Sequence, residues 1–139
     1  MYVDTSVLVA CYCPERLSQA AERLVWRSDA AAVSPLTEVE LCSALSLKVR
    51  TGELDRDSAG RILALFRTHL RDSYYRIVPV GAREYSLACE WIGRFAVPLR
   101  TADALHLAAA FANGLTLLTA DHDLARSARH FGVKYRLLS

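Results

Sequence analysis

A run of five residues, 115–119, constrains the fold more than any other segment of this chain. Its sequence, Leu-Thr-Leu-Leu-Thr, carries no charged or strongly polar face, which is typical of a parallel strand buried on both sides. A helix-like segment ends at Asn113-Gly114 just before the run, and Asp121 begins another just after it. Parallel strands need a long crossover, usually a helix, to reach a neighbouring strand. The run therefore predicts a sheet built from strand–helix units.

Short strand-like runs and helical segments alternate along the whole chain. The expected strands cover residues 1–9, 31–34, 75–80, 115–119 and 134–138, the last of them at an edge of the sheet. The expected helices cover residues 14–28, 36–50, 55–71, 83–95, 101–113 and 121–132. The residues suited to cap or stop these helices are Ser34, Asp55, Thr101 and Asp121 at N-termini and Gly52 and Gly132 at C-termini. The order predicts an α/β fold, a three-layer α/β/α sandwich with a mostly parallel central sheet, in one domain of residues 1–139.

Composition supports a globular protein. Of 139 residues, 53% are hydrophobic and 23% are charged, which is enough to bury a core without disulfides. The N-terminal apolar run is interrupted by Asp4 and lacks the basic flank of a secretory signal. No apolar segment of ~20 residues is present to span a bilayer. We therefore expect a soluble, cytoplasmic protein that does not interact with membranes.

The cysteines and tryptophans are expected to pack in the core. The sequence has one C-x-C pair and two single cysteines, at Cys11, Cys13, Cys42 and Cys89. This spacing lacks the paired C-x-x-C of a zinc ribbon, so we expect reduced thiols that behave as small hydrophobic residues. Trp26 and Trp91 are likewise expected in the core rather than as platforms for base stacking.

Four carboxylates interrupt apolar stretches where strands end or helices begin. They are Asp4, Glu40, Asp103 and Asp121. Burying a charge without a partner is expensive, and no obvious basic residue accompanies each acid. In an open parallel sheet, ligands bind beyond the carboxyl ends of the strands, where residues far apart in sequence can meet. A shared divalent cation would satisfy all four acids, which indicates a metal-dependent hydrolase of phosphate esters.

Each of these acids has a simpler explanation when it is taken alone. Asp121 is a suitable helix N-cap, and Asp103 and Asp123 suit the first turn of a helix, where the dipole favours negative charge. Asp4 precedes Thr5-Ser6 and can form an Asx turn. The joint pattern carries more weight than any single member.

Net charge argues only weakly for a partner. The value is +2, but if the four acids and Asp123 bind metal, ten acidic residues remain against 17 basic ones, which suits a polyanion better. Fifteen of the basic residues are arginine, a bias that a GC-rich genome also produces.

Four segments resemble the acidic motifs of the PIN-domain nucleases. They are Tyr2-Val3-Asp4-Thr5-Ser6-Val7-Leu8, Ser34-Pro35-Leu36-Thr37-Glu38-Val39-Glu40-Leu41, Arg100-Thr101-Ala102-Asp103-Ala104-Leu105-His106-Leu107-Ala108 and Leu118-Thr119-Ala120-Asp121-His122-Asp123-Leu124. The match runs nearly end to end in the right order, and the chain has the size of the prokaryotic VapC-like toxins. Helical periodicity does not distinguish Glu40 from Glu38, but the family's register assigns the metal-site acid to Glu40. Residues 55–85 carry no motif.

The resemblance implies a Mg²⁺- or Mn²⁺-dependent endoribonuclease that acts on RNA. Such proteins are usually the toxin of a toxin–antitoxin pair, so a small antitoxin partner and a homodimer are implied too. The implied catalytic residues and metal ligands are Asp4, Glu40, Asp103 and Asp121, with Asp123 as a further candidate metal ligand. Mg²⁺ and Mn²⁺ favour oxygen ligands, and a bound ion lowers the pKa of water and neutralises charge on the scissile phosphate. Whether one or two ions bind stays open.

Neighbouring polar residues are expected to support these acids. Thr5, Ser6 and Thr119 are candidates to donate hydrogen bonds that orient the carboxylates. His106 lies one helical turn beyond Asp103 and is expected to pack or hydrogen-bond rather than act as a general base. For Arg100, contact with a phosphate and a structural role are both open.

Other functions fit an α/β chain with these acids less well. A haloacid-dehalogenase phosphatase needs a second aspartate two residues after the first, where this chain has Ser6. A response-regulator receiver needs an acceptor aspartate at a mid-chain strand end, and none is there. An RNA-processing nuclease or a non-catalytic RNA-binding module on the same scaffold stays open. If an antitoxin binds, the helical surface of residues 36–70, rich in leucine and containing Phe66, is a candidate docking site.

Overall fold

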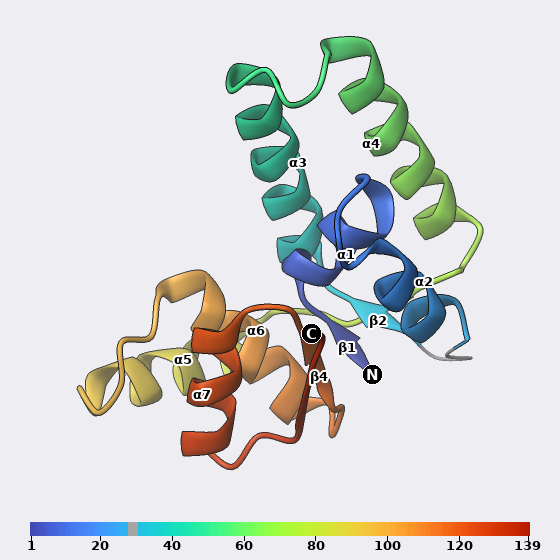
Figure 1. Ribbon diagram of the computed structural model, residues 1–139. Coiled ribbons are helices and arrows are strands. Elements are labelled where there is room, and N and C mark those ends of the chain that lie inside the picture. Colours follow the sequence, from blue (N-terminus) through green and yellow to red (C-terminus); the bar gives the residue numbers. More distant parts are fainter. Residues whose placement is uncertain (28–30) are drawn as a thin grey trace.

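A parallel sheet lies at the centre of the computed structural model, which describes residues 1–27 and 31–139 (Figure 1). Its strands in the described segments are β1 (Tyr2–Val3), β2 (Ala32–Val33), β3 (Arg76–Ile77), β4 (Leu117–Thr119) and β5 (Tyr135–Leu137). The order across the sheet is β3-β2-β1-β4-β5, and each neighbouring pair is parallel. β1 and β4 are therefore adjacent at the centre, and β5 lies at an edge as predicted.

Helices cover both faces of this sheet. In the described segments they are α1 (Thr5–Tyr12), α2 (Ser18–Trp26), α3 (Pro35–Arg50), α4 (Arg56–Arg71), α5 (Ala82–Gly93), α6 (Thr101–Ala112) and α7 (His122–His130). Side chains alternate along a strand, so Val3 and Leu118 pack with α1 to α4. Tyr2 and Leu117 point the other way and pack with α5 to α7. Figure 1 shows these two helical layers on opposite sides of the strands, which confirms the predicted three-layer fold.

The start of the chain differs from the expected strand over residues 1–9. β1 ends at Val3, and α1 begins at Thr5 with the Asp4 side chain as its N-cap, so the expected Asx turn at Asp4 opens a helix. α1 packs against α2, α3 and β4. A helix with neighbours on several sides does not need the single apolar stripe of a surface helix, and the sequence of α1 shows no such stripe. A short apolar run of this kind cannot be assigned to strand or helix from periodicity, and the expected strand was wrong from residue 4 onward.

Two other helices begin at different residues from those expected. The helix expected from Pro14 begins at Ser18. The Ser18 hydroxyl accepts a hydrogen bond from the Glu15 amide and donates one to the Cys13 carbonyl, so the residues before the helix form a turn. Its expected end at residue 28 lies outside the described residues. The N-cap of α6 is Arg100 rather than Thr101, which is the first helical residue.

The remaining caps are where the sequence placed them. The Ser34 amide donates to the Thr37 hydroxyl in a capping box at the start of α3. Asp55 accepts a hydrogen bond from the first turn of α4. Gly52 and Gly132 follow α3 and α7 with φ of 78° and 69°, a left-handed conformation that glycine adopts without strain.

Two of the residues expected in the core are exposed. Trp91 is 6% exposed, but Trp26 is 41% exposed because it sits at the outer end of α2, with one edge against Tyr12. All four cysteines are free thiols, but Cys89 lies on the outward side of α5. No helix in residues 1–27 and 31–139 is long and apolar enough to cross a membrane.

Candidate functional site

Asp4 lies at the carboxyl end of β1 and ties the two central strands together. Its Oδ2 accepts hydrogen bonds from the Ser6 hydroxyl at 2.7 Å and the Thr119 hydroxyl at 2.5 Å, and its Oδ1 accepts from the Ser6 amide at 3.2 Å. Asp4 is 5% exposed, and Thr119, at the end of β4, is fully buried. These donors offset part of the cost of burying the charge, so Asp4 does not depend on a cation alone.

The same two hydroxyls also hold the segment that leads into α7. The Ala120 amide donates to the Ser6 hydroxyl at 2.9 Å, and the Asp121 amide donates to the Thr119 hydroxyl at 2.9 Å. Each hydroxyl therefore donates its one proton to Asp4 while it accepts from the backbone. Asp4 and Asp121 are thus fixed relative to each other through Ser6 and Thr119.

Glu40 faces the same region from α3. Its Oε2 accepts a hydrogen bond from the Thr5 hydroxyl at 2.7 Å and contacts Nε2 of His106. Burial alone would raise the pKa of Glu40, but hydrogen bonds from His106 and Thr5 and the charge of His106 outweigh it and hold the pKa below its ordinary value. Glu40 is therefore a carboxylate at neutral pH.

Glu38, two residues earlier, faces away from these acids. Its Oε1 accepts from Nε of Arg67 at 2.9 Å, in an ion pair between the exposed sides of α3 and α4. The structure thus separates two acids that helical periodicity could not: Glu40 lies near enough to Asp103 to act on it through its charge, and Glu38 pairs with α4.

His106 supports Glu40 from inside the protein. It is 1% exposed, and its Nδ1 lies 2.7 Å from the Tyr2 hydroxyl. Its two ring nitrogens are therefore held by Glu40 on one side and by Tyr2 on the other. Burial, with the charges of Asp4 and Glu40, raises the pKa of Tyr2 to about 12, so the phenol stays protonated at neutral pH. His106 packs and hydrogen-bonds, as the sequence led us to expect.

The charge of Asp103 has less support from neighbouring groups than that of the other acids in this region. It lies half-buried in the first turn of α6, and its carboxylate has no hydrogen-bond or ion-pair partner among the residues that the structure describes. Burial raises the pKa of Asp103, and the charges of Asp121, Asp4 and Glu40 raise it further. A cation placed at Asp103 would relieve this repulsion.

A cavity of about 320 Å³ opens beside Asp103, and Arg100, Asp121 and Asp123 also line it. Asp121 caps α7 through Oδ1, which accepts from the amides of Asp123 at 2.7 Å and Leu124 at 3.1 Å. Its Oδ2 takes no hydrogen bond within the described part of the chain. Asp123 is exposed and forms an ion pair with Arg126, one turn along α7. Asp4 and Glu40 do not line this cavity but act on Asp103 through their charge.

The chemistry of these donors fits a hard divalent cation, although the residues that the structure describes do not form a complete metal site. Throughout residues 1–27 and 31–139, no three His, Cys, Asp or Glu side chains are grouped closely enough to hold a metal ion. Oxygens of Asp4 and Glu40 are occupied by hydrogen bonds. Mg²⁺, however, binds through one or two carboxylates and keeps several waters. The unpaired carboxylate of Asp103 and the unused Oδ2 of Asp121 match that mode.

Tyr2 and Ser34 also belong to this region, although the sequence indicated no role for Tyr2 and only a helix cap for Ser34. The Tyr2 hydroxyl lies between Ser34 Oγ, at 2.8 Å, and His106. The available signal was a tyrosine in a short buried strand, since a buried phenol needs a hydrogen-bond partner. Which partner it finds depends on how β1, α3 and α6 pack.

Comparison with known proteins places the chain in a family. The model of the PIN domain matches residues 1–130, and no curated protein sequence matches. Among solved structures, the fold is similar to that of VapBC2 from Rickettsia felis, bound to a DNA fragment from its promoter, with a TM-score of 0.71, 15% identity and coverage of 99% of this chain and 98% of that one.

Two proteins of Mycobacterium tuberculosis have similar folds as well. VapC20, a sarcin–ricin loop cleaving toxin, is 21% identical with a TM-score of 0.68, over 91% of this chain and 93% of that one. VapBC-5, from the VapBC family of toxin–antitoxin systems, is 18% identical with a TM-score of 0.63, over 99% and 95%. Identities this low show a shared fold. The family model, which covers most of the chain, confirms the resemblance seen in the four acidic motifs: the chain belongs to the PIN domain family.

Proposed function

We propose that this protein is a Mg²⁺- or Mn²⁺-dependent endoribonuclease, the toxin of a toxin–antitoxin pair that acts in the cytoplasm. The observation that best supports a metal-dependent reaction is that the charge of Asp103 is unpaired and repelled by its neighbours. Its half-buried carboxylate lacks a hydrogen-bond partner among the described residues, and nearby carboxylates raise its pKa. A divalent cation is the simplest group that removes this repulsion and also attracts a phosphate.

The metal ligands in this proposal are Asp103 and Asp121, with Asp4, Glu40 and Asp123 binding directly or through water. When bound, the cation supplies Lewis-acid chemistry: it activates water for attack and neutralises charge on the scissile phosphate and leaving oxygen. Membership of the PIN domain family supports this ligand set, because each of the acids lies in one of the four motifs.

The protein's own side chains keep the acids charged and oriented. Thr5 and His106 hold Glu40 in its ionised form, and Ser6 and Thr119 fix the carboxylate of Asp4. Preorganised donors of this kind avoid rearrangement during the reaction. Arg100, in the lining of the same cavity, is placed to donate hydrogen bonds to a phosphate of the RNA backbone.

Cleavage of single-stranded RNA during a titration with Mg²⁺ or Mn²⁺ tests this proposal. We expect Asp4→Asn, Glu40→Gln, Asp103→Asn and Asp121→Asn each to reduce cleavage by at least about 100-fold, with the fold unchanged by circular dichroism. Glu38→Gln is the matched control, because it removes a carboxylate from the same helix outside the site. Parental cleavage by two of the four acid variants would refute the assignment.

A second candidate is a non-catalytic RNA-binding module, or an RNA-processing nuclease without a toxin role. The lack of a finished three-ligand group in the described residues favours the non-catalytic form. RNA binding that requires no metal, unaffected by all four acid substitutions, would support it. Membership of the PIN domain family excludes the phosphatase and receiver alternatives.

For the antitoxin, we propose the surface formed by α3 and α4. These helices enclose a groove of about 500 Å³, whose lining includes Leu45, Val49 and Leu63. Phe66, which the sequence suggested as part of this surface, is fully buried and cannot contribute. VapBC-5 belongs to a family of toxin–antitoxin systems, which supports a protein partner. A homodimer is proposed on the same family resemblance.

A further inference from the structure

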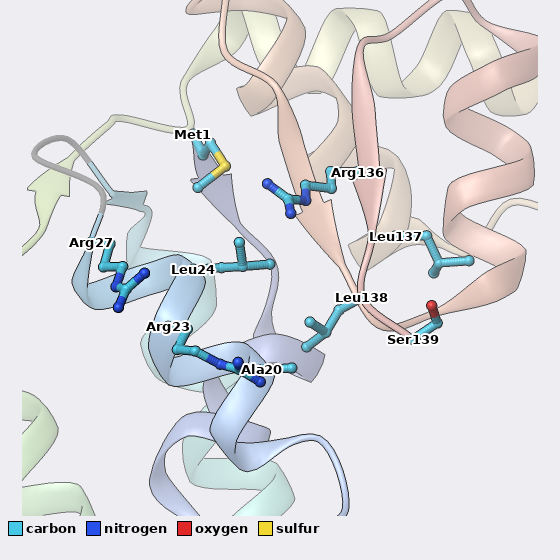
Figure 2. Close-up of a pocket in the computed structure, with 9 residues that line it drawn as sticks. All are labelled: Met1, Ala20, Arg23, Leu24, Arg27, Arg136, Leu137, Leu138 and Ser139. Carbon is cyan, nitrogen blue, oxygen red and sulfur yellow. The ribbon is translucent and has the colours of Figure 1, made fainter.

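A second cavity, of about 700 Å³, lies between α2 and the edge strand β5 (Figure 2). It shares no lining residue with the cavity beside Asp103. Its volume falls within the range of sites that bind small organic ligands, about 300–1,000 Å³. No role in the proposed nuclease reaction accounts for it.

Arginines from two distant parts of the sequence line this cavity. Arg23 lies in the last turn of α2, Arg27 is the C-cap residue that follows this helix, and Arg136 comes from β5. Figure 2 shows Arg136 extending from β5 toward α2. Within the described residues, none of the three forms an ion pair, and no aspartate or glutamate is among the lining residues. Ser139 adds the carboxylate that ends this chain, so three guanidinium groups are set against one carboxylate and the described lining keeps a net positive charge.

The arginines keep most of their hydrogen-bond donors available. Arg23 donates from Nε to the Gln19 carbonyl at 3.1 Å, which leaves its two terminal nitrogens. Arg136 lies beside Leu118 in the register of β5 with β4. A charge on an edge strand discourages pairing with another chain, which would account for Arg136 alone. It does not account for two further arginines on the facing helix.

Apart from Ser139, the other side chains of the lining are apolar. Ala20 and Leu24 contribute from α2, and Leu138, which is 4% exposed, contributes from the chain after β5. A fully solvated inorganic ion does not need such a surface. A ligand that combines phosphates with an apolar ring system does, because the ring loses contact with water while guanidinium groups bind the phosphates in a bidentate manner.

We propose that this cavity binds a free nucleotide, with its phosphates at Arg27, Arg136 and Arg23 and its base against Leu24 and Leu138. The site is independent of the acidic cluster and does not rest on the nuclease proposal. It requires no divalent cation, because the arginines supply the positive charge.

Isothermal titration calorimetry with ADP, in EDTA and low salt, tests this proposal. We expect saturable binding to the parent protein and at least about 10-fold weaker binding for each of Arg27→Gln and Arg136→Gln, since each loses charge-assisted hydrogen bonds. The double variant Arg61→Gln/Arg129→Gln removes two exposed charges elsewhere and should bind ADP like the parent. Adenosine should bind far more weakly than ADP, and inorganic phosphate more weakly too.

Amide chemical shifts locate the ligand independently. They should change at Leu24 and Leu138 and not at Asp103 or Asp121. Equal loss of binding in the control double variant would overturn the proposal, as would the absence of saturable ADP binding by the parent. Tighter binding of a 5′-phosphorylated oligoadenylate than of ADP would also overturn it, because the ligand would then be RNA.

Discussion

Replacing Asp103 by asparagine tests whether the carboxylates repel one another in the metal-free protein. Asp103 lies in the first turn of α6, where its charge also interacts favourably with the helix dipole. Asp57, exposed in the first turn of α4, makes the same kind of dipole interaction and provides a matched control. Only Asp103 also faces repulsion from Asp121, Asp4 and Glu40.

The expected size of the effect follows from these two contributions. Each substitution removes a dipole interaction of about 0.3–1 kcal/mol. Asp103→Asn also relieves repulsion at a half-buried site, on the order of 1 kcal/mol after screening by solvent. At pH 7 without metal, Asp57→Asn should therefore lower stability, while Asp103→Asn should leave it unchanged or raise it. A difference of about 1 kcal/mol corresponds to ~4 °C in Tm for a domain of this size.

The pH dependence of this difference has a definite sign. Burial and neighbouring charges raise the pKa of Asp103 in the folded state, so the folded protein keeps a proton that the unfolded chain releases near pH ~4. The parent should therefore lose stability relative to Asp103→Asn as pH rises from about 4 through the raised pKa. Below pH ~4 both states are protonated, and the gap should close.

Calorimetric melting between pH ~4 and ~8 in EDTA, followed by addition of Mg²⁺, measures these effects. Metal at a hundredfold excess over its Kd stabilises the parent by about 2.7 kcal/mol, or ~10 °C. That shift should be lost in Asp103→Asn and kept in Asp57→Asn. If both variants lose the same stability at neutral pH, or if the parent and Asp103→Asn respond equally to Mg²⁺, the reasoning about Asp103 is wrong.

Three further substitutions test the hydrogen bonds and the toxin proposal. Tyr2→Phe leaves buried Nδ1 of His106 without its hydrogen-bond partner, so urea unfolding should show a loss of about 1–3 kcal/mol, against little change for exposed Tyr135→Phe. Thr119→Val removes a donor to buried Asp4 and should cost a similar ~1–3 kcal/mol; a loss below ~0.5 kcal/mol would mean that water replaces the hydroxyl. Expression in bacteria should arrest growth for the parent but not for Asp4→Asn at equal protein level, and arrest by the variant would assign toxicity to another cause.

Local sequence determined most of the helices and the order of the elements. Ser34, Asp55 and Asp121 cap helices through bonds to residues within three positions, and Gly52 and Gly132 end them through their own φ angles. Such interactions depend on a few adjacent residues, which is why the sequence alone predicts them. The run 115–119 predicted a strand buried on both faces, and β4 is buried and lies inside the sheet between β1 and β5.

Only tertiary packing decided which polar residues meet. The apolar segment after Asp4 reads equally as strand or helix, and contacts with α2, α3 and β4 made it helical. Glu40 and Glu38 are equivalent by helical period, and only the approach of α6 places His106 at Glu40, while α4 gives Glu38 its partner. The cavity at Arg27 and Arg136 joins residues more than a hundred positions apart. Long-range pairings of this kind depend on the geometry of the sheet and its two helical layers, which no local pattern in the sequence encodes.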